Sequence, residues 1–379
     1  MVTFDHGKGD IPQVIPIITE NIRTGKDNYT WGRPASDSRI LKLLNISPQK
    51  LGVSEEEPIA ELWLASDDQT YSSVAKLADD STIKLSALLQ EQGENILGYE
   101  HFRRYGPSMA TIMKCIDAGQ SLSVQVHPAM GHLTRPAKPE MWMPRYEGAS
   151  LYLGFNQNIN SEQLQQAYAQ GTLENLLYPL QAKPEDLIIV GGGLIHAIRQ
   201  GTTLWEWSHA PTGEEIKKGD LKHATVSPWD RTDGKKQRPN KEDIDSTLEV
   251  LDDATNRAGL PVYKEIDLAN IFSSRKTLLT MGDNEITRLF TTPEVIVDEI
   301  RVGSVLKQET NNHGYPLFVM EGSVEILSGT QPYVYVLPSA ACVIMSASAG
   351  RYMLINKDTH NPSRVIRWYA PLDSDLKPN

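Results

Sequence analysis

Residues 121–128, Ser-Leu-Ser-Val-Gln-Val-His-Pro, constrain the fold more than any other stretch of the chain. Apolar and polar residues alternate along it, which is the period-two pattern of a half-buried β-strand. The alternation places Gln125 and His127 on one face of the strand. Pro128 ends the strand because proline has no N–H to donate to a neighbouring strand. An amide oxygen and an imidazole presented together need a partner, and a metal ion is one such partner.

Two further segments each carry one strong metal ligand within an apolar strand pattern. Residues 138–142 place Glu140 directly before large apolar residues, and residues 188–198 carry His196 after a glycine turn. A lone histidine on a strand is more often an ordinary packed residue, so the hypothesis needs these segments to converge. The resulting set is Gln125, His127, Glu140 and His196. Two oxygen and two nitrogen ligands suit zinc and are tolerated by manganese, iron or cobalt.

Seven blocks in a fixed order carry a resemblance to a known family, over roughly the first 250 residues. They are 28–32 (NYTWG), 60–63 (AELW), 112–118 (IMKCIDA), the strand at 121–128, 138–140 (KPE), 151–155 (LYLGF) and 195–197 (IHA). The chain resembles the type I phosphomannose isomerases, zinc-dependent enzymes of the cupin superfamily that interconvert mannose 6-phosphate and fructose 6-phosphate. The resemblance implies an aldose–ketose isomerase that works through a cis-enediol and takes a small sugar phosphate as its partner.

We therefore expect a mainly β fold of two jelly-roll (cupin) barrels with a small helical insert. Residues 1–255 are expected to form the catalytic, metal-binding cupin domain, with the insert near residues 156–182. Residues 256–379 are expected to form a second cupin-like domain without a metal site. Short β-type segments separated by glycine and proline are typical of a jelly roll. Of the metal-ligand side chains in this part, His313 has only Glu309 as a possible partner.

Helical spacing of apolar residues predicts three helical regions. Residues 82–104 contain a short helix, and residues 241–254 form another. In the insert, Ser161 can cap a helix, and the leucines of residues 173–180 continue a similar apolar face beyond Gly171.

Three candidate catalytic residues have side chains that can exchange or stabilise protons. Lys114 lies in an apolar strand segment, where a cation is costly unless it faces a polar cavity. Lys138 lies two residues before Glu140, so on an extended segment it shares that residue's face. The resemblance makes Glu206, ten residues after His196, a pocket carboxylate. We expect these residues to move protons or stabilise the enediolate, with lysine pKa values lowered by a nearby metal cation.

Five residues are candidate substrate-binding residues. The resemblance places Trp31 at the rim of the sugar pocket and Glu61 on the substrate side. The phosphate needs hydroxyl and cationic donors, for which Ser121, Ser123 and Arg199 are the candidates.

The chain departs from the family pattern after Glu206. Residues 208–211 stand where the family has an Asn-Ser-Asp segment, and the arginine expected beyond it is missing. Candidates to replace that arginine are Lys217, Lys218, Lys222 and Arg231, and the sequence does not choose among them. A cupin oxygenase, detectable by oxygen uptake, and a non-catalytic or altered-specificity sugar-binding protein are therefore alternative functions.

Composition narrows the partners and the location. A length of 379 residues accommodates two domains with full cores. The net charge of −11 argues against nucleic acid or an anionic membrane as the main partner. Cys115 and Cys342, the two cysteines, lie in apolar contexts, which predicts no disulfide framework. The first twelve residues have no apolar signal region, so a cytoplasmic location is expected, whereas the oligomeric state is not indicated.

Overall fold

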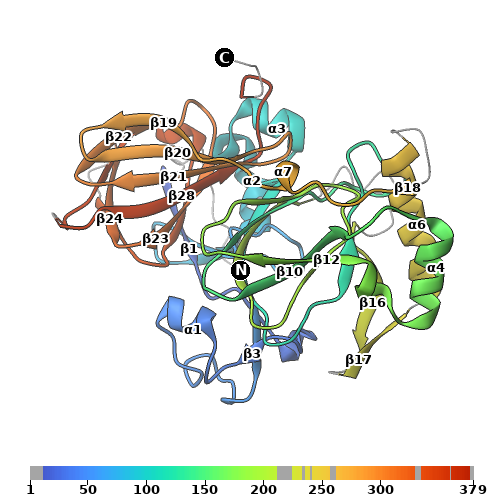
Figure 1. The fold of residues 1–379 in the computed structure, drawn as a ribbon. Coiled ribbons are helices and arrows are strands. Elements are labelled where there is room, and N and C mark those ends of the chain that lie inside the picture. Colours follow the sequence, from blue (N-terminus) through green and yellow to red (C-terminus); the bar gives the residue numbers. More distant parts are fainter. Residues whose placement is uncertain are drawn as a thin grey trace.

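The computed structural model describes residues 12–210, 224–232, 235–239, 241–256, 262–328, 334–358 and 360–375. Within these ranges the chain forms two antiparallel β-barrels, drawn mainly in green and in orange to red in Figure 1. The expected mainly β, cupin-like architecture is confirmed.

Two facing sheets make the first barrel. The β10 sheet runs β12 (Leu177–Ala182), β10 (Ala149–Phe155), β14 (His196–Ile198), β8 (Val124–Val126), β16 (Val226–Thr232) and β17 (Lys235–Pro239). The β7 sheet runs β13 (Ile188–Val190), β9 (Glu140–Pro144), β15 (Thr203–His209), β7 (Thr111–Asp117), β4 (Pro58–Leu64) and β2 (Ile22–Thr24), with β3 (Arg33–Pro34) paired to β4. The strand predicted at 121–128 is present as β8, although only its central residues pair in the ladder.

The second barrel also has two sheets, and one of them includes strands from the start of the chain. The β28 sheet runs β19 (Lys276–Met281), β20 (Asn284–Thr291), β21 (Ile296–Val302), β28 (Ser363–Tyr369), β23 (Tyr315–Glu321), β26 (Cys342–Met345), β1 (Val14–Ile18), β5 (Val74–Lys76) and β6 (Thr82–Lys84). The β24 sheet runs β22 (Val305–Glu309), β27 (Arg351–Ile355), β24 (Ser323–Ser328) and β25 (Val334–Pro338). Strands β1, β5 and β6 thus cross the predicted boundary near residue 255, and the two-domain division stays a prediction.

Helices and short turns complete the described chain. They are η1 (Gly25–Asp27), α1 (Arg39–Leu44), α2 (Leu85–Leu97), α3 (Tyr99–Tyr105), α4 (Ser161–Gln170), η2 (Leu173–Leu176), α6 (Lys241–Asn256), α7 (Leu268–Ile271) and η3 (Ala347–Ala349), beside a small ladder of β11 (Ile159–Asn160) and β18 (Val262–Tyr263). The helices predicted within 82–104 and at 241–254 are confirmed as α2 and α6.

The prediction for the insert is correct only in its first half. Helix α4 forms, and its N-cap is Asn160, one residue before the predicted cap at Ser161. Gly171, with a φ of 67°, ends the helix in the left-handed region that glycine tolerates. The expected continuation along residues 173–180 holds only over residues 173–176, which form the short helix η2, and is wrong beyond them, because residues 177–182 form strand β12. There Leu180 pairs with Leu151, so cross-strand packing outweighs a weak helical spacing.

The two barrels pack together through their largest sheets. On the β7 sheet, Trp205 and Trp207 point away from the first barrel's interior and contribute to a buried apolar cluster shared with the β28 sheet. The Trp205 ring lies 5.2 Å from the ring of Phe318, and the Trp207 ring lies 5.8 Å from the ring of Phe290. Because side chains alternate along a strand, Glu206, which lies between these tryptophans, faces the other way, into the first barrel.

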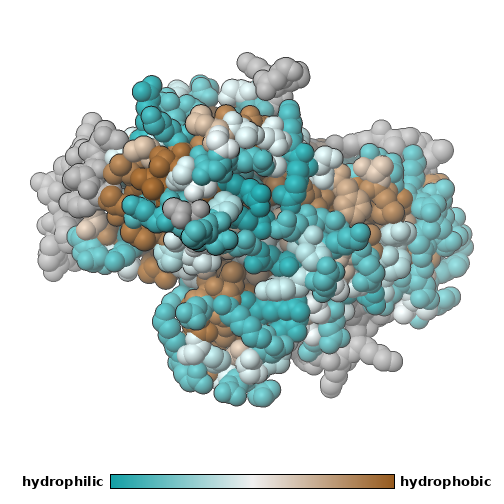
Figure 2. All heavy atoms as spheres, turned by 60° about the vertical axis from the view of Figure 1, so that its left-hand side comes forward, coloured by the Kyte–Doolittle hydropathy of each residue, from teal (hydrophilic) through white to brown (hydrophobic). Residues whose placement is uncertain are grey.

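Cys115 and Cys342 are both buried and free, as predicted, and both belong to this apolar cluster between the barrels. Figure 2 brings the second barrel forward and shows hydrophilic side chains over much of that face, between separate apolar patches. Val305, Val334 and Val336 on the β24 sheet are 45%, 49% and 66% exposed. None of the helices in the described ranges has the length and apolar character that crossing a membrane requires.

A buried pair of histidines joins α3 to the second barrel. His313 does not pair with Glu309; its Nε2 lies 3.2 Å from Nδ1 of His101. The Nε2 of His101 lies 2.8 Å from the carbonyl oxygen of Ser108, which only accepts, so Nε2 of His101 carries the proton. Nδ1 of His101 then accepts a hydrogen bond from His313. Burial lowers the pKa of His101 to about 4 and the pKa of His313 to about 3.

We predict that replacing His313 with Gln flattens the acid dependence of stability. Both imidazoles are neutral in the folded chain, whereas the unfolded chain protonates them below about pH 6.5. Their contribution is therefore complete above pH 6.5 and is lost as the pH falls toward 4 and then 3. Between pH 6.5 and 4.5 the free energy of unfolding should fall less steeply in His313→Gln than in the wild type, by about 1.4 kcal/mol per pH unit for each proton no longer taken up.

Urea unfolding at several pH values measures this difference. The exposed His360 supplies a control for the substitution itself, because it lies outside the buried His101–His313 pair. Parallel curves for His313→Gln and the wild type would contradict the prediction.

Candidate active site

A cavity of about 220 Å³ lies between the two sheets of the first barrel. Its lining joins aromatic and aliphatic residues to three carboxylates and two lysines. The lining residues are Tyr29, Trp31, Glu61, Lys114, Ile116, Leu122, Ser123, Gln125, Lys138, Glu140, Trp142, His196, Ala197, Ile198, Glu206 and Thr225. Such a mixture of an apolar wall and convergent polar groups is typical of a small-molecule site.

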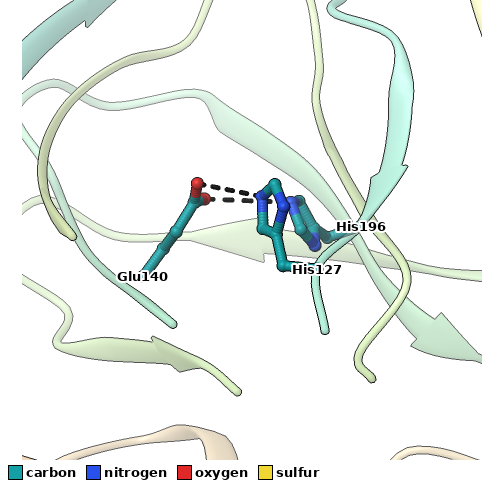
Figure 3. A group of neighbouring side chains, drawn as sticks. All are labelled: His127, Glu140 and His196. Carbon is teal, nitrogen blue, oxygen red and sulfur yellow. Dashed lines mark ion pairs between the residues drawn. The ribbon is translucent and has the colours of Figure 1, made fainter. Parts of the chain in front are cut away.

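Three residues of the predicted metal set meet at this cavity. His127, Glu140 and His196 are buried, and one potential ligand atom from each lies within 4.8 Å of the others. Figure 3 shows the two imidazoles turned toward the Glu140 carboxylate. The Nε2 of His127 lies 3.0 Å from Oε1 of Glu140, and the Nε2 of His196 lies 3.8 Å from Oε2. Each carboxylate oxygen therefore faces a different imidazole.

Backbone carbonyls fix the tautomers of both histidines. The Nδ1 of His127 lies 3.2 Å from the carbonyl oxygen of Ala224, and the Nδ1 of His196 lies 2.8 Å from that of Leu194. A carbonyl oxygen only accepts, so Nδ1 of each ring carries the proton and the Nε2 lone pairs point toward Glu140.

The buried Nε2 of His127 has no hydrogen-bond partner in the described chain, although Glu140 is close. A buried acceptor nitrogen without a hydrogen bond, beside a second imidazole and a carboxylate, fits a divalent metal ion.

The glycine turn before His196 brings its loop against the loop that follows His127. The N–H of Gly193 donates to the carbonyl oxygen of His127 at 2.7 Å. A Cβ atom on Gly192 would lie only 2.3 Å from Cα of Ala129, so this close approach requires glycine. The triple glycine is thus a tight turn, as predicted, and it fixes the spacing of the two histidines.

Gln125 lies next to the cluster. It sits on β8 directly opposite His196 of β14 and lines the same cavity. The structure therefore brings all four predicted ligands to one place.

Buried ion pairs hold the two cavity lysines. The Nζ of Lys138 lies 2.8 Å from Oε1 of Glu140. The Nζ of Lys114 lies 3.3 Å from Oε1 of Glu206 and 3.8 Å from Oε2 of Glu61. Lys138 and Glu140 therefore share a face, as the spacing predicted.

The lowering of the lysine pKa values expected from a nearby metal cation stays a prediction, and the protein groups alone act in the opposite direction on Lys114. Burial acts to lower its pKa, but Glu206 and then Glu61 outweigh burial and raise the pKa above its ordinary value.

Burial and charge also set the protonation of the neighbouring groups. Burial raises the pKa of Glu206, and the Glu140 charge raises it further, against the lowering effect of Lys114. Burial acts to raise the pKa of Glu140 as well, but the Lys138 ammonium holds that pKa well below its usual range. Burial, followed by His127, lowers the pKa of His196 to about 4. The imidazole of His196 is therefore neutral, as a metal ligand must be, down to mildly acidic pH.

The substrate candidates divide into two groups. Trp31, Glu61 and Ser123 line the cavity. Ser121 and Arg199 do not belong to the lining: Oγ of Ser121 accepts a hydrogen bond from the backbone N–H of Gln200. Arg199 donates to Oγ of Ser150 at 3.0 Å and stacks over Tyr152. The substrate role expected for Ser121 and Arg199 stays a prediction to which the geometry adds nothing.

The sequence analysis missed several lining residues. Thr225 directly precedes β16 and follows Ala224, whose carbonyl oxygen accepts a hydrogen bond from His127. Trp142 donates its indole N–H to Oε2 of Glu140 at 3.2 Å, and its place two residues beyond Glu140 on β9 was the available signal. The candidates Lys217, Lys218 and Lys222 lie outside the described residues, as does the side chain of Arg231.

Together, the paired barrels and the histidine–glutamate cluster give a cupin-like fold with a candidate metal centre in its first barrel. Residues 20–147 match the family described as "Phosphomannose isomerase type I, catalytic domain". The resemblance noted from the sequence is therefore confirmed for this segment, which carries Gln125, His127 and Glu140.

Comparison with individual proteins gives the same relation. The mannose-6-phosphate isomerase of Streptococcus mutans is 30% identical over 160 residues, which cover 40% of this chain and 48% of that protein. That of Ogataea parapolymorpha is 28% identical over 107 residues, which cover 27% of this chain and 24% of that protein. The chain thus spans less than half the length of these curated relatives.

Solved structures show the same fold along nearly the whole chain. The mannose 6-phosphate isomerase from Bacillus subtilis superimposes with a TM-score of 0.66 at 16% identity, covering 94% of this chain and 99% of that one. A zinc-bound mannose 6-phosphate isomerase superimposes with a TM-score of 0.66 at 15% identity, covering 95% of this chain and 100% of that one.

We predict that His127→Ala and His196→Ala each remove tightly bound metal. Each change takes away one of the converging Nε2 lone pairs, which should weaken metal affinity at least tenfold. Elemental analysis after dialysis, with zinc titration of the metal-free protein, measures the loss. His132→Ala changes a histidine that does not belong to the His127–Glu140–His196 cluster and should retain the wild-type metal content. Wild-type stoichiometry in both cluster variants would show that the metal is held elsewhere.

Proposed function

We propose that this chain is a metal-dependent aldose–ketose isomerase that interconverts mannose 6-phosphate and fructose 6-phosphate through a cis-enediol. One observation carries the proposal: Glu140 and His196 of the histidine–glutamate cluster line the same small cavity as the Lys114–Glu206 ion pair. Isomerisation needs these two elements together, because it requires a group that exchanges protons and a positive environment for the oxygens of the intermediate. The match of residues 20–147 to the type I catalytic domain supports the same reaction.

Gln125, His127, Glu140 and His196 would hold the metal. Zinc is the proposed ion, supported by this ligand chemistry and by the zinc-bound isomerase of similar fold, and manganese, iron or cobalt fit the same ligands. The bound ion would supply Lewis acidity toward the sugar oxygens.

The Lys114–Glu206 pair supplies the proton chemistry. Converting the aldose to the ketose removes a proton from C2 and places one on C1, while the hydroxyl proton of O2 is lost and O1 gains one. Glu206 is a buried carboxylate with a raised pKa, which suits it to accept the C2 proton and return it to C1. Lys114 stays protonated because its pKa is raised, so it serves as a cation and donor beside the developing negative charge.

Lys138 and the remaining lining residues would place the sugar. Lys138 keeps the Glu140 carboxylate in a fixed position and offers a second ammonium group to the cavity. Trp31 supplies an apolar wall, and Glu61 and Ser123 offer partners for sugar hydroxyls. We keep the division into residues 1–255 and 256–379 and the cytoplasmic location as parts of this proposal.

A substrate panel on the metal-loaded protein tests the function. Hexose 6-phosphates and the corresponding free hexoses are supplied in D₂O and followed by NMR, with zinc or manganese present. We expect mannose 6-phosphate and fructose 6-phosphate to interconvert, with deuterium appearing on the exchanged carbon wherever the transferred proton mixes with solvent. Sugar binding without turnover would instead indicate a binding protein, and oxygen uptake would indicate an oxygenase.

We further predict that Glu206→Gln lowers kcat by about 10²- to 10⁴-fold, the usual contribution of a general acid–base group. An amide cannot accept the C2 proton, yet it retains the shape of the side chain, so metal content should stay at the wild-type value. Glu294→Gln is the matched control, because Glu294 is also buried with a raised pKa but does not line the cavity. Equal kcat values for the two variants would remove Glu206 from the mechanism.

A further inference from the structure

Trp63 lies beside the cavity on the same strand as Glu61. On β4, Glu61 and Trp63 are two residues apart and face the same side, whereas Leu62 between them belongs to the apolar cluster shared with the second barrel. Trp63 is also the register partner of Lys114 on the neighbouring strand β7. One indole is thereby placed against both an acidic and a basic group of the site.

The indole contacts each of these groups in a different way. Its N–H donates to Oε2 of Glu61 at 2.6 Å, and the same oxygen lies 3.8 Å from Nζ of Lys114. The ring centroid of Trp63 lies 4.8 Å from Nζ of Lys114, within the range of a cation–π contact. We propose that Trp63 is a positioning residue of this site, which holds Glu61 and Lys114 in their working orientations. This inference deepens the proposed isomerase function and rests on it.

Sharing one oxygen of Glu61 has two consequences. The hydrogen bond from Trp63 fixes the carboxylate and limits how strongly Oε2 attracts Lys114, whose ammonium lies closer to Glu206. Within the described ranges, Oε1 of Glu61 has neither a hydrogen bond nor an ion pair, so it is available to a sugar hydroxyl. Trp63 therefore separates the two tasks of Glu61, which are to balance the Lys114 charge and to face the substrate.

Further contacts hold the indole itself in place. Tyr71 packs edge-on against Trp63, with ring centroids 5.6 Å apart and planes at 77°. The guanidinium of Arg23 lies 4.2 Å from the Tyr71 ring and 5.8 Å from the Trp63 ring. Because its neighbours fix its orientation, Trp63 can impose a fixed direction on the Glu61 carboxylate.

The test compares Trp63→Phe with a matched tryptophan change and with a change of Glu61. Trp63→Phe keeps an aromatic face but removes the N–H donor. Trp205→Phe removes a buried indole N–H that has no hydrogen-bond partner in the described chain and that lies between the barrels, outside the cavity. Unfolding midpoints and metal content establish that each zinc-loaded protein is intact.

We expect Trp63→Phe to lower kcat for mannose 6-phosphate about 10- to 100-fold, the range typical of residues that orient a metal or catalytic site. Trp205→Phe should stay within about twofold of the wild type. In a Glu61→Gln background the Trp63→Phe change should have little further effect, because the partner it acts through is altered. The inference would be overturned if Trp63→Phe were as active as Trp205→Phe. It would also be overturned if Trp63→Phe lowered kcat by the same factor in the Glu61→Gln background as in the wild type.

A spectroscopic measurement separates this inference from the proposed reaction. The indole N–H of Trp63, assigned by its loss in Trp63→Phe, should resonate downfield in the ¹H–¹⁵N spectrum and move upfield in Glu61→Gln. That shift supports the positioning contact even if the wild type turns over no sugar, in which case only the proposed reaction fails. If the chemical shift of the Trp63 indole N–H is the same in Glu61→Gln as in the wild type, the contact is refuted whether or not the protein is active.

Discussion

The apolar contact between the β7 sheet and the β28 sheet decides where the polar groups of this protein can lie. Trp205 and Trp207 of β15 pack against rings of the second barrel, and Glu206 between them is thereby turned into the first barrel. The same alternation on β7 directs Lys114 inward, between outward-facing Met113 and Cys115. A slip of one residue in register would exchange the two faces and bury charges between the barrels, so the core contact also specifies the site.

The cavity contains a buried charge system whose members compensate one another. Lys114 and Lys138 each lie within 4 Å of a carboxylate, and the three lining carboxylates exceed the two lining lysines by one. A local excess of negative charge favours a divalent cation, even before its ligands are considered. Buried pairs of this kind are expensive to desolvate and are costly to break, so they hold their geometry without substrate. Such preorganisation is what electrostatic catalysis requires.

The sequence was sufficient for residues that stand as single polar groups in strand-like apolar segments, where the family resemblance pointed to the same positions. Gln125, His127, Glu140 and His196 each stand in an apolar strand context; the structure clusters His127 with Glu140 and His196, and Gln125 lines the same cavity as those two. Lys114 was expected to face a polar cavity because it is a cation in an apolar strand segment. Lys138 was expected on the same side as Glu140 because the two are two residues apart on an extended segment. In contrast, Ser121 and Arg199 were chosen by chemistry without a strand phase, and hydrogen bonds to the backbone of Gln200 and to Ser150 hold them elsewhere.

Other structural features depend on which strands pair with one another, and the local sequence pattern does not reveal that pairing. Residues 177–182 have an acceptable helical spacing, but the open edge of β10 makes them a strand. Trp63 carries the same phase signal as Glu61, yet its importance becomes visible only when Lys114 lies opposite it in register. Thr225 reaches the cavity because β16 pairs with β8, a contact between segments about a hundred residues apart.

Strand β1 has a consequence for how the molecule is assembled. Its residues 14–18 hydrogen-bond on one side to β5 and on the other to β26, whose residues 342–345 are synthesised long after β1. The edge of β1 that pairs with β26 therefore remains unpaired until the ribosome has made the residues between the two strands. Closing so large a loop slows folding and leaves an aggregation-prone edge uncovered meanwhile. The sheet that contains β1 and β26 can therefore close only after two segments far apart in the sequence have both been made.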